Sequence, residues 1–269
     1  MILNSRPLLS LLLLAILMGG IELFEFIKNV GKGGPMAETV EVDGGALPAT
    51  SEVKEKRVGR FWVGKYEVTW REWQAVREWA VKKGYEVEEG GEKGLEHPVT
   101  NVNWYSAVKW CNARSEKEGL TAVYEEGGAV YRSGKSVPTV KAGANGYRLP
   151  SDGEWEWAAR GGVKGKGYEY SGSNDAKAVA WTYQNSGGGV HMVGTKLGNE
   201  LGIFDMSGNV WEWCFDEIFG PYRVMRGGGW DADVPNGGSD SARVSYRNSG
   251  APSHGNTHGG FRVARSSVP

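Results

Sequence analysis

Residues 208–230 read Gly-Asn-Val-Trp-Glu-Trp-Cys-Phe-Asp-Glu-Ile-Phe-Gly-Pro-Tyr-Arg-Val-Met-Arg-Gly-Gly-Gly-Trp. The stretch begins at a tight turn and then presents Trp211 and Trp213, two residues expected to pack in the core. A strand is predicted from Tyr222 to Arg226. Three glycines and Trp230 close the stretch. This pattern is typical of a segment with a fixed structural role, which we call framework.

The segment that follows this framework differs sharply in composition. Residues 231–259 are almost entirely small or polar residues and glycine, and a second framework motif, Gly260-Phe261-Arg262-Val263, comes after them. The last glutamate of the whole chain is Glu217 and the last lysine is Lys196. The change predicts either a flexible loop or a surface whose side chains follow a different rule from those of the core.

The bulk composition describes a globular protein. With 269 residues, of which 40% are hydrophobic, the chain can bury one large core in a single domain after a leader. A formal net charge of −1 offers no electrostatic footprint for nucleic acid, so none is expected as a partner. Twelve tryptophans among 42 glycines favour aromatic clusters that hold long loops in place.

The two cysteines, Cys111 and Cys214, are too few for a disulfide framework and are not spaced as a local metal site. Each follows a tryptophan in an apolar context. We therefore expect both to be buried as small hydrophobic residues, in preference to a bridge or a reactive thiol.

The N-terminus predicts export. Arg6 precedes an apolar run from Leu8 to Met18, which matches the charged and hydrophobic regions of a signal peptide and is short for a membrane span. The cleavage signal around Met18 is poor, so an uncleaved membrane anchor is the alternative. The protein is expected to be secreted or held at the cell surface, and to meet a membrane only through this segment.

Three regions follow from these observations. Residues 1–27 are predicted to be the signal peptide or N-terminal membrane anchor, residues 28–58 a linker and lead-in, and residues 59–269 the folded domain. Within that domain, residues 230–260 are predicted to be the ligand-binding region. A monomer is expected.

Few helices and short strands predict an α+β fold with much irregular loop. The helix N-termini are expected at Thr69 (capping box with Glu72), Asn103 and Ser151 (capping box with Glu154), and the ends at Gly84, Gly119 and Gly161. Strands are expected over Arg60–Val68, Ala129–Arg132, Tyr222–Arg226, Val244–Arg247 and Phe261–Ala264. The tryptophans expected to pack the core are Trp62, Trp104, Trp155, Trp211 and Trp213.

Several ordered motifs carry a family resemblance. They are Gly64-Lys65-Tyr66-Glu67-Val68-Thr69, His97-Pro98-Val99-Thr100-Asn101-Val102, Trp104 with Trp110-Cys111-Asn112, Tyr147-Arg148-Leu149-Pro150-Ser151 with Glu154-Trp155-Glu156-Trp157-Ala158, Gly208-Asn209-Val210-Trp211-Glu212-Trp213, Arg226-Gly227-Gly228 and Gly260-Phe261-Arg262. Together they resemble the formylglycine-generating-enzyme-like (sulfatase-modifying factor) family from Gly59 to Arg265. The resemblance implies an elaborated C-type-lectin fold.

The best-known activity of that family is copper-dependent oxidation of a sulfatase cysteine. It resides in two cysteines a few residues after the Arg-Gly-Gly motif, and residues 231–269 contain none. A thiolate pair is what ligates soft Cu(I), so no copper is expected and an oxidase is disfavoured. An iron site is disfavoured as well, since His97, His191, His254 and His258 form no facial triad with a carboxylate at helical spacing.

A structural calcium ion is the one metal that the resemblance implies. Its ligands would be two carboxylates and two main-chain carbonyls at a tight turn, from Asp205, Gly208, Val210 and Glu212, and oxygen ligands suit a hard cation. The alternative is that Asp205 caps the turn and Glu212 pairs with an arginine such as Arg226 or Arg262.

Some members of this fold branch resemble the variable proteins of diversity-generating retroelements, in which a template copy is rewritten at its adenines and pasted into the 3′ end of the gene. The favoured template codon is AAY, which encodes Asn. Changes at its two adenines cannot yield Lys, Glu, Gln, Met or Trp, and residues 231–259 contain none of these. The bland alternative is an ordinary Gly/Ser/Asn loop whose small residues satisfy turns.

The sequence thus predicts an exported, non-enzymatic display protein whose diversified C-terminal surface binds a protein or glycan ligand, because binding residues sit on loops over a rigid scaffold. The alternative is an oxidoreductase relative, or a catalytically dead structural partner. The residues predicted to contact the ligand are Asp231, Ala232, Asp233, Asn236, Ser239, Asp240, Asn248, Ser249, Ser253, His254, Asn256, Thr257 and His258. Their aspartates favour a basic partner, weakly.

Overall fold

The computed structural model describes residues 38–91, 93–232 and 240–267. The leader predicted over residues 1–27 lies outside this part. Among the residues described, no helix is long and apolar enough to cross a bilayer.

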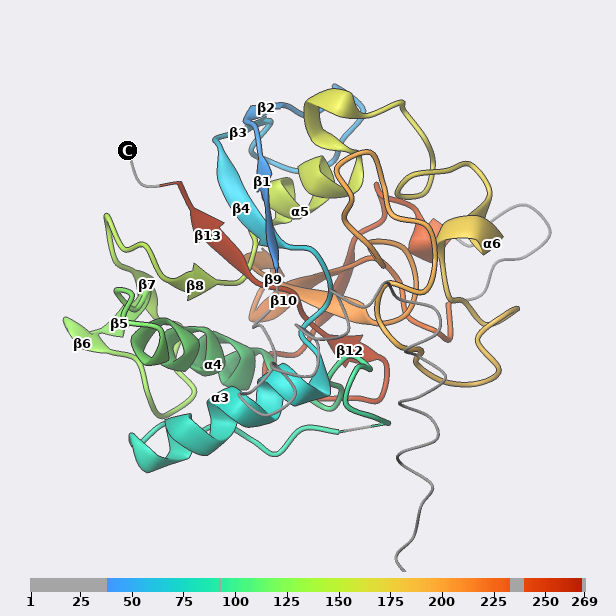
Figure 1. Cartoon of the computed structure of the whole chain (residues 1–269). Helices are drawn as coiled ribbons and strands as arrows, with labels where there is room; N and C mark the ends of the chain where they lie inside the picture. Colours follow the sequence, from blue (N-terminus) through green and yellow to red (C-terminus); the bar gives the residue numbers. More distant parts are fainter. Residues whose placement is uncertain (1–37, 92, 233–239, 268–269) are drawn as a thin grey trace, which may run out of the picture. The chain divides into compact units, whose positions relative to one another are not determined.

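The first of two four-stranded sheets joins the two ends of the folded chain (Figure 1). Its order is β1 (Thr39–Val42), β4 (Phe61–Gly64), β13 (Ala264–Ser266) and β8 (Tyr147–Arg148), and all neighbouring strands are antiparallel. Phe61 and Val63 alternate inward and are buried, as the two-residue period of a strand requires. The C-terminal framework motif is therefore held against the beginning of the domain.

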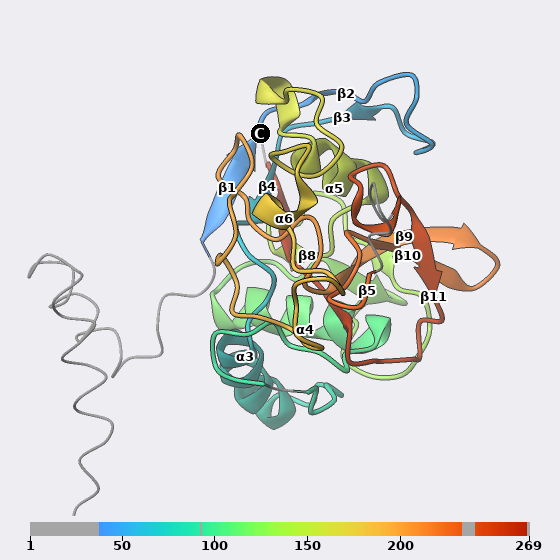
Figure 2. The same ribbon diagram turned by 90° about the vertical axis from the view of Figure 1, so that its right-hand side faces the viewer.

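The second sheet supports the segment of unusual composition. Its order is β11 (Asn248–Gly250), β10 (Tyr222–Arg226), β9 (Trp211–Phe219) and β12 (Gly259–Gly260), and Figure 2 shows β9, β10 and β11 side by side. β9 and β10 form an antiparallel hairpin with a shifted register, whereas β12 runs parallel to β9. Residues 251–258 thus connect the two outer strands of one sheet.

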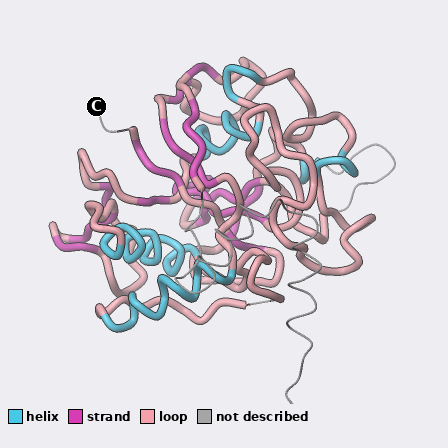
Figure 3. Tube along the Cα trace, in the orientation of Figure 1, coloured by secondary structure: helices cyan, strands magenta, loops and turns pink. Residues whose placement is uncertain are grey.

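Most of the rest of the described chain is loop, as Figure 3 shows, and the described residues include four α-helices. The helices are α3 (Trp70–Lys82), α4 (Trp104–Lys117), α5 (Asp152–Ala159) and α6 (Ala176–Val179), and the short 3-10 helices are η1 (Gly162–Lys164) and η2 (Asp240–Ala242). Two small sheets complete the described part, β2 (Gly45–Ala46) with β3 (Arg57–Val58), and β6 (Ala129–Val130), β5 (Tyr124–Glu126) and β7 (Thr139–Val140).

The predicted helix starts are confirmed. Thr69 and Ser151 form reciprocal capping boxes with the third residue of their helices, and the side chain of Asn103 accepts the backbone N–H of Ser106. Gly84 and Gly119 follow the helix ends with positive φ, where glycine avoids a steric penalty. Trp73 of α3 stacks on Trp110 of α4 with centroids 5.9 Å apart, so the two helices lie side by side.

Buried tryptophans tie the helices to the second sheet. The Trp104 ring nitrogen donates to the carbonyl of Cys214 at 2.9 Å, and that of Trp213 donates to the carbonyl of Val102 at 2.8 Å. Pairing the indole N–H inside the core avoids the cost of a buried, unsatisfied donor. Four of the five tryptophans predicted to form the core are buried, and Trp62 is half-buried.

The structure corrects several boundaries. Residues 39–58, predicted as linker and lead-in, carry β1 to β3, and Leu47 and Val53 are buried in the core. Val244–Arg247 is turn and coil, not a strand, because the carbonyls of Val244 and Tyr246 are taken by the Arg226 side chain. Phe261–Ala264 is extended only from Ala264 on, since the preceding residues leave one sheet to enter the other.

Candidate functional site

The C-terminal segment is attached to the framework mainly through its backbone. The N–H of Asn101 donates to the carbonyl of Asn256 at 2.8 Å, and the N–H of Trp104 donates to the carbonyl of Pro252 at 3.1 Å. The Trp230 ring nitrogen donates to the carbonyl of Thr257 at 3.1 Å. These bonds involve no side chain of the segment, so substitutions at its exposed positions leave them in place.

Gly255 lies against the backbone of the framework. A Cβ atom at this position would lie 2.6 Å from the carbonyl carbon of Asn101, which is backbone and cannot move aside cheaply. The segment is consequently seated on residues 101–104, at the beginning of α4.

Several polar side chains of the same segment are exposed to solvent. The predicted contact residues that are exposed or half-buried in the structure form a surface, which we call the C-terminal surface. Asn248, Ser253, His254, Thr257 and Asp231 are exposed, whereas Ser249, Asn256 and His258 are half-buried. A fixed backbone with exposed polar side chains is the arrangement that the display hypothesis requires.

The two parts of the predicted contact region meet at one pair of side chains. The ring Nδ1 of His258 lies 2.9 Å from the Oδ2 atom of Asp231, and the two side chains are 33% and 36% exposed. Asp231 follows β10 by a few residues, and His258 precedes β12. The contact therefore bridges the two edges of the segment next to Trp230.

Five predicted contact residues are not part of the C-terminal surface. Ala232 is buried, with its carbonyl accepting the N–H of Tyr183 at 3.0 Å, so its prediction as a contact residue is corrected. Asp240 begins η2. Asp233, Asn236 and Ser239 lie outside the described residues.

An aromatic residue missed by the sequence reasoning lies beside this surface. Tyr183 is 68% exposed, and its backbone N–H donates to the carbonyl of Ala232, the residue after Asp231. The hydroxyl of Ser186 donates to the carbonyl of Trp230 at 3.0 Å, which fixes the same loop there. Residues 181–197 are irregular and carry no periodic pattern, so no sequence signal placed them near the C-terminal segment.

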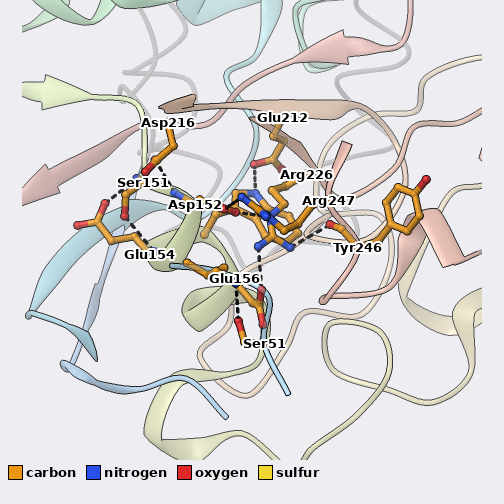
Figure 4. A network of polar contacts seen from close by, with 12 residues as sticks. Ser51, Ser151, Asp152, Glu154, Glu156, Glu212, Asp216, Arg226, Tyr246 and Arg247 are labelled. Carbon is orange, nitrogen blue, oxygen red and sulfur yellow. Dashed lines mark hydrogen bonds and ion pairs between the residues drawn. The ribbon is translucent and has the colours of Figure 1, made fainter. Parts of the chain in front are cut away.

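A buried charge network supports the C-terminal surface from below (Figure 4). Arg226 donates from Nε to Asp152 at 2.6 Å and from Nη2 to Glu156 at 2.7 Å. Arg247 reaches the other carboxylate oxygen of Asp152 at 2.6 Å. Burial alone would lower the pKa of Arg226, but the two carboxylates outweigh burial and raise it. The network fixes the turn before β11 to helix α5.

A second buried cluster occupies the predicted calcium position. Glu212 accepts from Arg262 at both carboxylate oxygens and from the Trp155 ring nitrogen at 2.7 Å. This matches the alternative interpretation, in which Glu212 pairs with an arginine. The described residues contain no group of three or more His, Cys, Asp or Glu side chains arranged to hold a metal ion.

The turn that contains Asp205 has its own geometry. Asp205 adopts a φ of 58°, and its Oδ2 atom accepts the N–H of Gly194 at 2.6 Å. A Cβ on Gly208 would lie 2.2 Å from the carbonyl oxygen of Trp181, so this turn requires glycine. Burial raises the pKa of Asp205 to about 6, and its Oδ1 atom has no partner in the described part of the chain. A calcium ion here stays a prediction, and Glu212 does not fit as its ligand.

The family follows from a scan against family models. The model described as "Sulfatase-modifying factor enzyme 1-like domain" matches residues 24–267. The chain belongs to the sulfatase-modifying factor family. The resemblance carried by the ordered motifs is thereby confirmed.

Two curated relatives of this sulfatase-modifying factor protein differ in what they are named for. "Chaperone protein LppX" of Paenibacillus barcinonensis is 37% identical over 243 residues, which cover 78% of this chain and 82% of the relative. "Inactive C-alpha-formylglycine-generating enzyme 2" of Bos taurus is 28% identical over 183 residues, covering 63% of this chain and 50% of the relative. The chain thus spans about half the length of the latter.

Two solved structures establish the fold of the family member. CarF has a TM-score of 0.74 at 29% identity, covering 87% of this chain and 99% of its own. Treponema denticola variable protein 1 has a TM-score of 0.66 at 28% identity, covering 87% of this chain and all (100%) of its own. The predicted α+β fold of the formylglycine-generating-enzyme-like, C-type-lectin kind is confirmed.

The thiols of this family member lie in its core. Cys111 and Cys214 are both free and buried, as predicted, and burial raises the pKa of each thiol above its ordinary value. Neither belongs to the C-terminal segment. A buried thiol with a raised pKa is a poor nucleophile and a poor metal ligand.

Proposed function

We propose that this protein is an exported, non-enzymatic binding protein whose C-terminal surface recognises a protein or glycan ligand. One observation carries the proposal: the backbone carbonyls of residues 251–258 accept hydrogen bonds from Asn101, Trp104 and Trp230, while the side chains of Ser253, His254 and Thr257 are exposed. Surface side chains can then change without disturbing the core, because substitutions at such positions usually alter stability by less than about 0.5 kcal/mol.

We further propose that this surface is diversified by a retroelement. The absence of Lys, Glu, Gln, Met and Trp from residues 231–259 supports the idea, as does the similarity to Treponema denticola variable protein 1. Trp230, which directly precedes the segment, is a residue that an AAY codon cannot yield.

The non-enzymatic character is supported by chemistry and by one relative. Residues 231–269 contain no cysteine, so the thiolate pair on which copper-dependent oxidation depends is missing from the position where the resemblance places it. The similarity to an inactive formylglycine-generating enzyme agrees with this view.

A second candidate function is a structural or chaperone role towards another exported protein. It is favoured by the similarity to LppX, which is named as a chaperone. A chaperone of this kind would suppress aggregation of an unfolding secreted enzyme in a light-scattering assay. A display protein would leave the aggregation rate unchanged.

The coding sequence tests the diversification directly. We expect a near-repeat of the 3′ end beside the gene, differing at positions where the repeat carries adenine, together with a reverse transcriptase gene. Absence of both from the complete surrounding genome would refute diversification. The binding proposal would then depend on ligand capture alone.

A further inference from the structure

A small cavity lies beside the beginning of helix α4. Its volume is about 240 Å³, and it is formed by three segments of the chain. The residues that line it are Glu86, Val87, Glu88, Asn103, Tyr105, Ser106, Lys109, Gly134 and Lys135. We call it the α4 pocket. Its size is below the usual range of about 300–1,000 Å³ for drug-sized ligands, so it suits one ring-sized group.

The polar groups of the α4 pocket are built into the fold. Asn103, Ser106 and Lys109 are only 2%, 2% and 4% exposed, although each contributes to the cavity wall. The ammonium group of Lys109 donates to the carbonyl of Gly134 at 3.1 Å, and the Oγ atom of Ser106 accepts the N–H of Glu88 at 3.4 Å. These contacts orient the side chains before any ligand arrives, which lowers the entropic cost of binding.

The charges of the pocket cancel. Glu86 and Glu88 carry two negative charges, and Lys109 and Lys135 carry two positive ones. A simple anion or cation would meet like charge on one side of the cavity. An apolar ligand would strip water from polar groups without replacing it. Hydroxyl groups both donate and accept, so a neutral polyol satisfies carboxylates and ammonium groups together.

Tyr105 adds an aromatic surface. Its ring is half-buried, and it is held edge-on against Trp104 with centroids 5.4 Å apart. An amphipathic ring of this kind offers an apolar face to a ligand that is polar at its rim. A pyranose has such a shape.

The α4 pocket adjoins the C-terminal surface. Asn103 caps α4, and the next residue, Trp104, hydrogen-bonds the carbonyl of Pro252. A chain of linked sugars held in the pocket at one end could therefore extend over Ser253 and His254, which are exposed.

We propose that the α4 pocket binds one neutral monosaccharide unit of a glycan, with Tyr105 stacking on the ring and Glu88 and Lys109 bonding its hydroxyls. The side-chain amide of Asn103 donates to Glu88 at 2.5 Å and orients that carboxylate. Binding of one sugar in the pocket does not depend on the proposed function. Binding of the rest of the glycan does, because that part would lie on the C-terminal surface. The pocket consists of framework residues, so it is a constant subsite beside the diversified C-terminal surface. Burial lowers the pKa of Lys109, which agrees with an ammonium group held away from bulk water.

Saturation-transfer NMR on the whole chain tests the subsite, with glucose, galactose, mannose and N-acetylglucosamine as separate probes. We expect transfer to at least one sugar at millimolar concentration, and loss of about tenfold in affinity in Tyr105→Ala, which removes the stacking ring. Lys109→Met should lower the affinity for the same sugar. Tyr222→Ala and Lys117→Met, exposed residues of the same types elsewhere, should bind as the wild type does.

The outcomes separate this inference from the proposed function. No transfer to any of the four sugars, or equal transfer in Tyr105→Ala and wild type, would overturn the sugar subsite. Backbone amide shifts of the wild type on titration with sugar provide a second readout if Lys109→Met fails to fold, and shifts confined to residues far from Tyr105 would also overturn it. Because these probes need no residue of the C-terminal surface, a negative result leaves that surface free to bind another ligand.

Discussion

Glu212 and Arg262 form a bidentate ion pair in the core, with both nitrogen–oxygen distances at 2.6 Å and neither side chain exposed to solvent. The pair connects β9 to the framework motif that ends the domain. Arg262 also donates to the carbonyls of Gly64 and Phe204. One arginine thereby ties both sheets and the turn before β9 together.

Removing one partner of this pair should destabilise the fold. Glu212→Ala leaves a buried guanidinium without its carboxylate, which costs about 3–5 kcal/mol of unfolding free energy. Urea denaturation measures the loss, and Glu89→Ala, at an 86% exposed side chain, serves as the control with little effect. A Glu212→Ala protein as stable as the wild type would show that the pair contributes nothing.

The calcium prediction is separable from the ion pair. If a cation binds the turn at Asp205, a chelator should lower the melting temperature of the wild type, because a ligand that binds only the native state stabilises it. Calcium added back should restore the melting temperature. The same treatment of Asp205→Asn should have no effect. Wild-type melting that is insensitive to chelator would remove calcium from this protein.

Two neighbouring residues of the C-terminal segment should respond in opposite ways. His254→Ala should change stability by less than about 0.5 kcal/mol, because the side chain is exposed. Gly255→Ala should cost about 1–3 kcal/mol, because the added carbon meets the backbone of Asn101. Thermal unfolding of both variants checks the pair. Equal tolerance at the two positions would mean that the backbone is not fixed there.

The Arg148–Glu154 pair predicts a pH dependence. Burial alone would raise the pKa of Glu154, but Arg148 at 2.6 Å outweighs it, and the pKa lies below its ordinary value. The unfolded state therefore binds the proton more readily, so this contribution is present above an unfolded pKa of about 4.3 and is lost as the pH falls through the lower folded pKa. Glu154→Gln should flatten the decline of stability in acid. Glu89→Gln should leave the decline as it is, and identical acid profiles for wild type and Glu154→Gln would contradict the assignment.

Local chemistry made the helices and the framework predictable. Capping residues and the glycines after the helix ends are short-range signals, and both act within a few residues of the position they define. β10 was predicted correctly because Tyr222–Arg226 contains strand-favouring Tyr222 and Val224 and is bounded by Gly-Pro before it and by glycines after it. β9 was missed as a strand because Trp211–Phe219 contains inward and outward residues that do not alternate cleanly.

Long-range contacts could not be predicted. Residues 39–58 join the core through the pairing of β1 with β4 and through the burial of Leu47 and Val53, and no local pattern predicts either. The same is true of the site. The composition of residues 231–259 identified the C-terminal segment, but burial of Ala232 and the approach of Tyr183 depend on how a distant, irregular loop folds back. The α4 pocket likewise needs three segments that are separate in sequence.

A ligand-capture experiment tests whether the C-terminal surface binds a ligand. We would compare the wild type with a variant that carries alanine at Asn248, Ser253, His254 and Thr257, and with a control that carries alanine at Val81, Val137, Val140 and Val163, all at least 51% exposed and outside the C-terminal surface. Each protein is immobilised and probed with glycan arrays and surface proteins of candidate partner cells. We expect wild type and control to bind the same ligand, and the surface variant to lose it while keeping its melting temperature. Undiminished binding by a folded surface variant would show that the ligand is bound elsewhere.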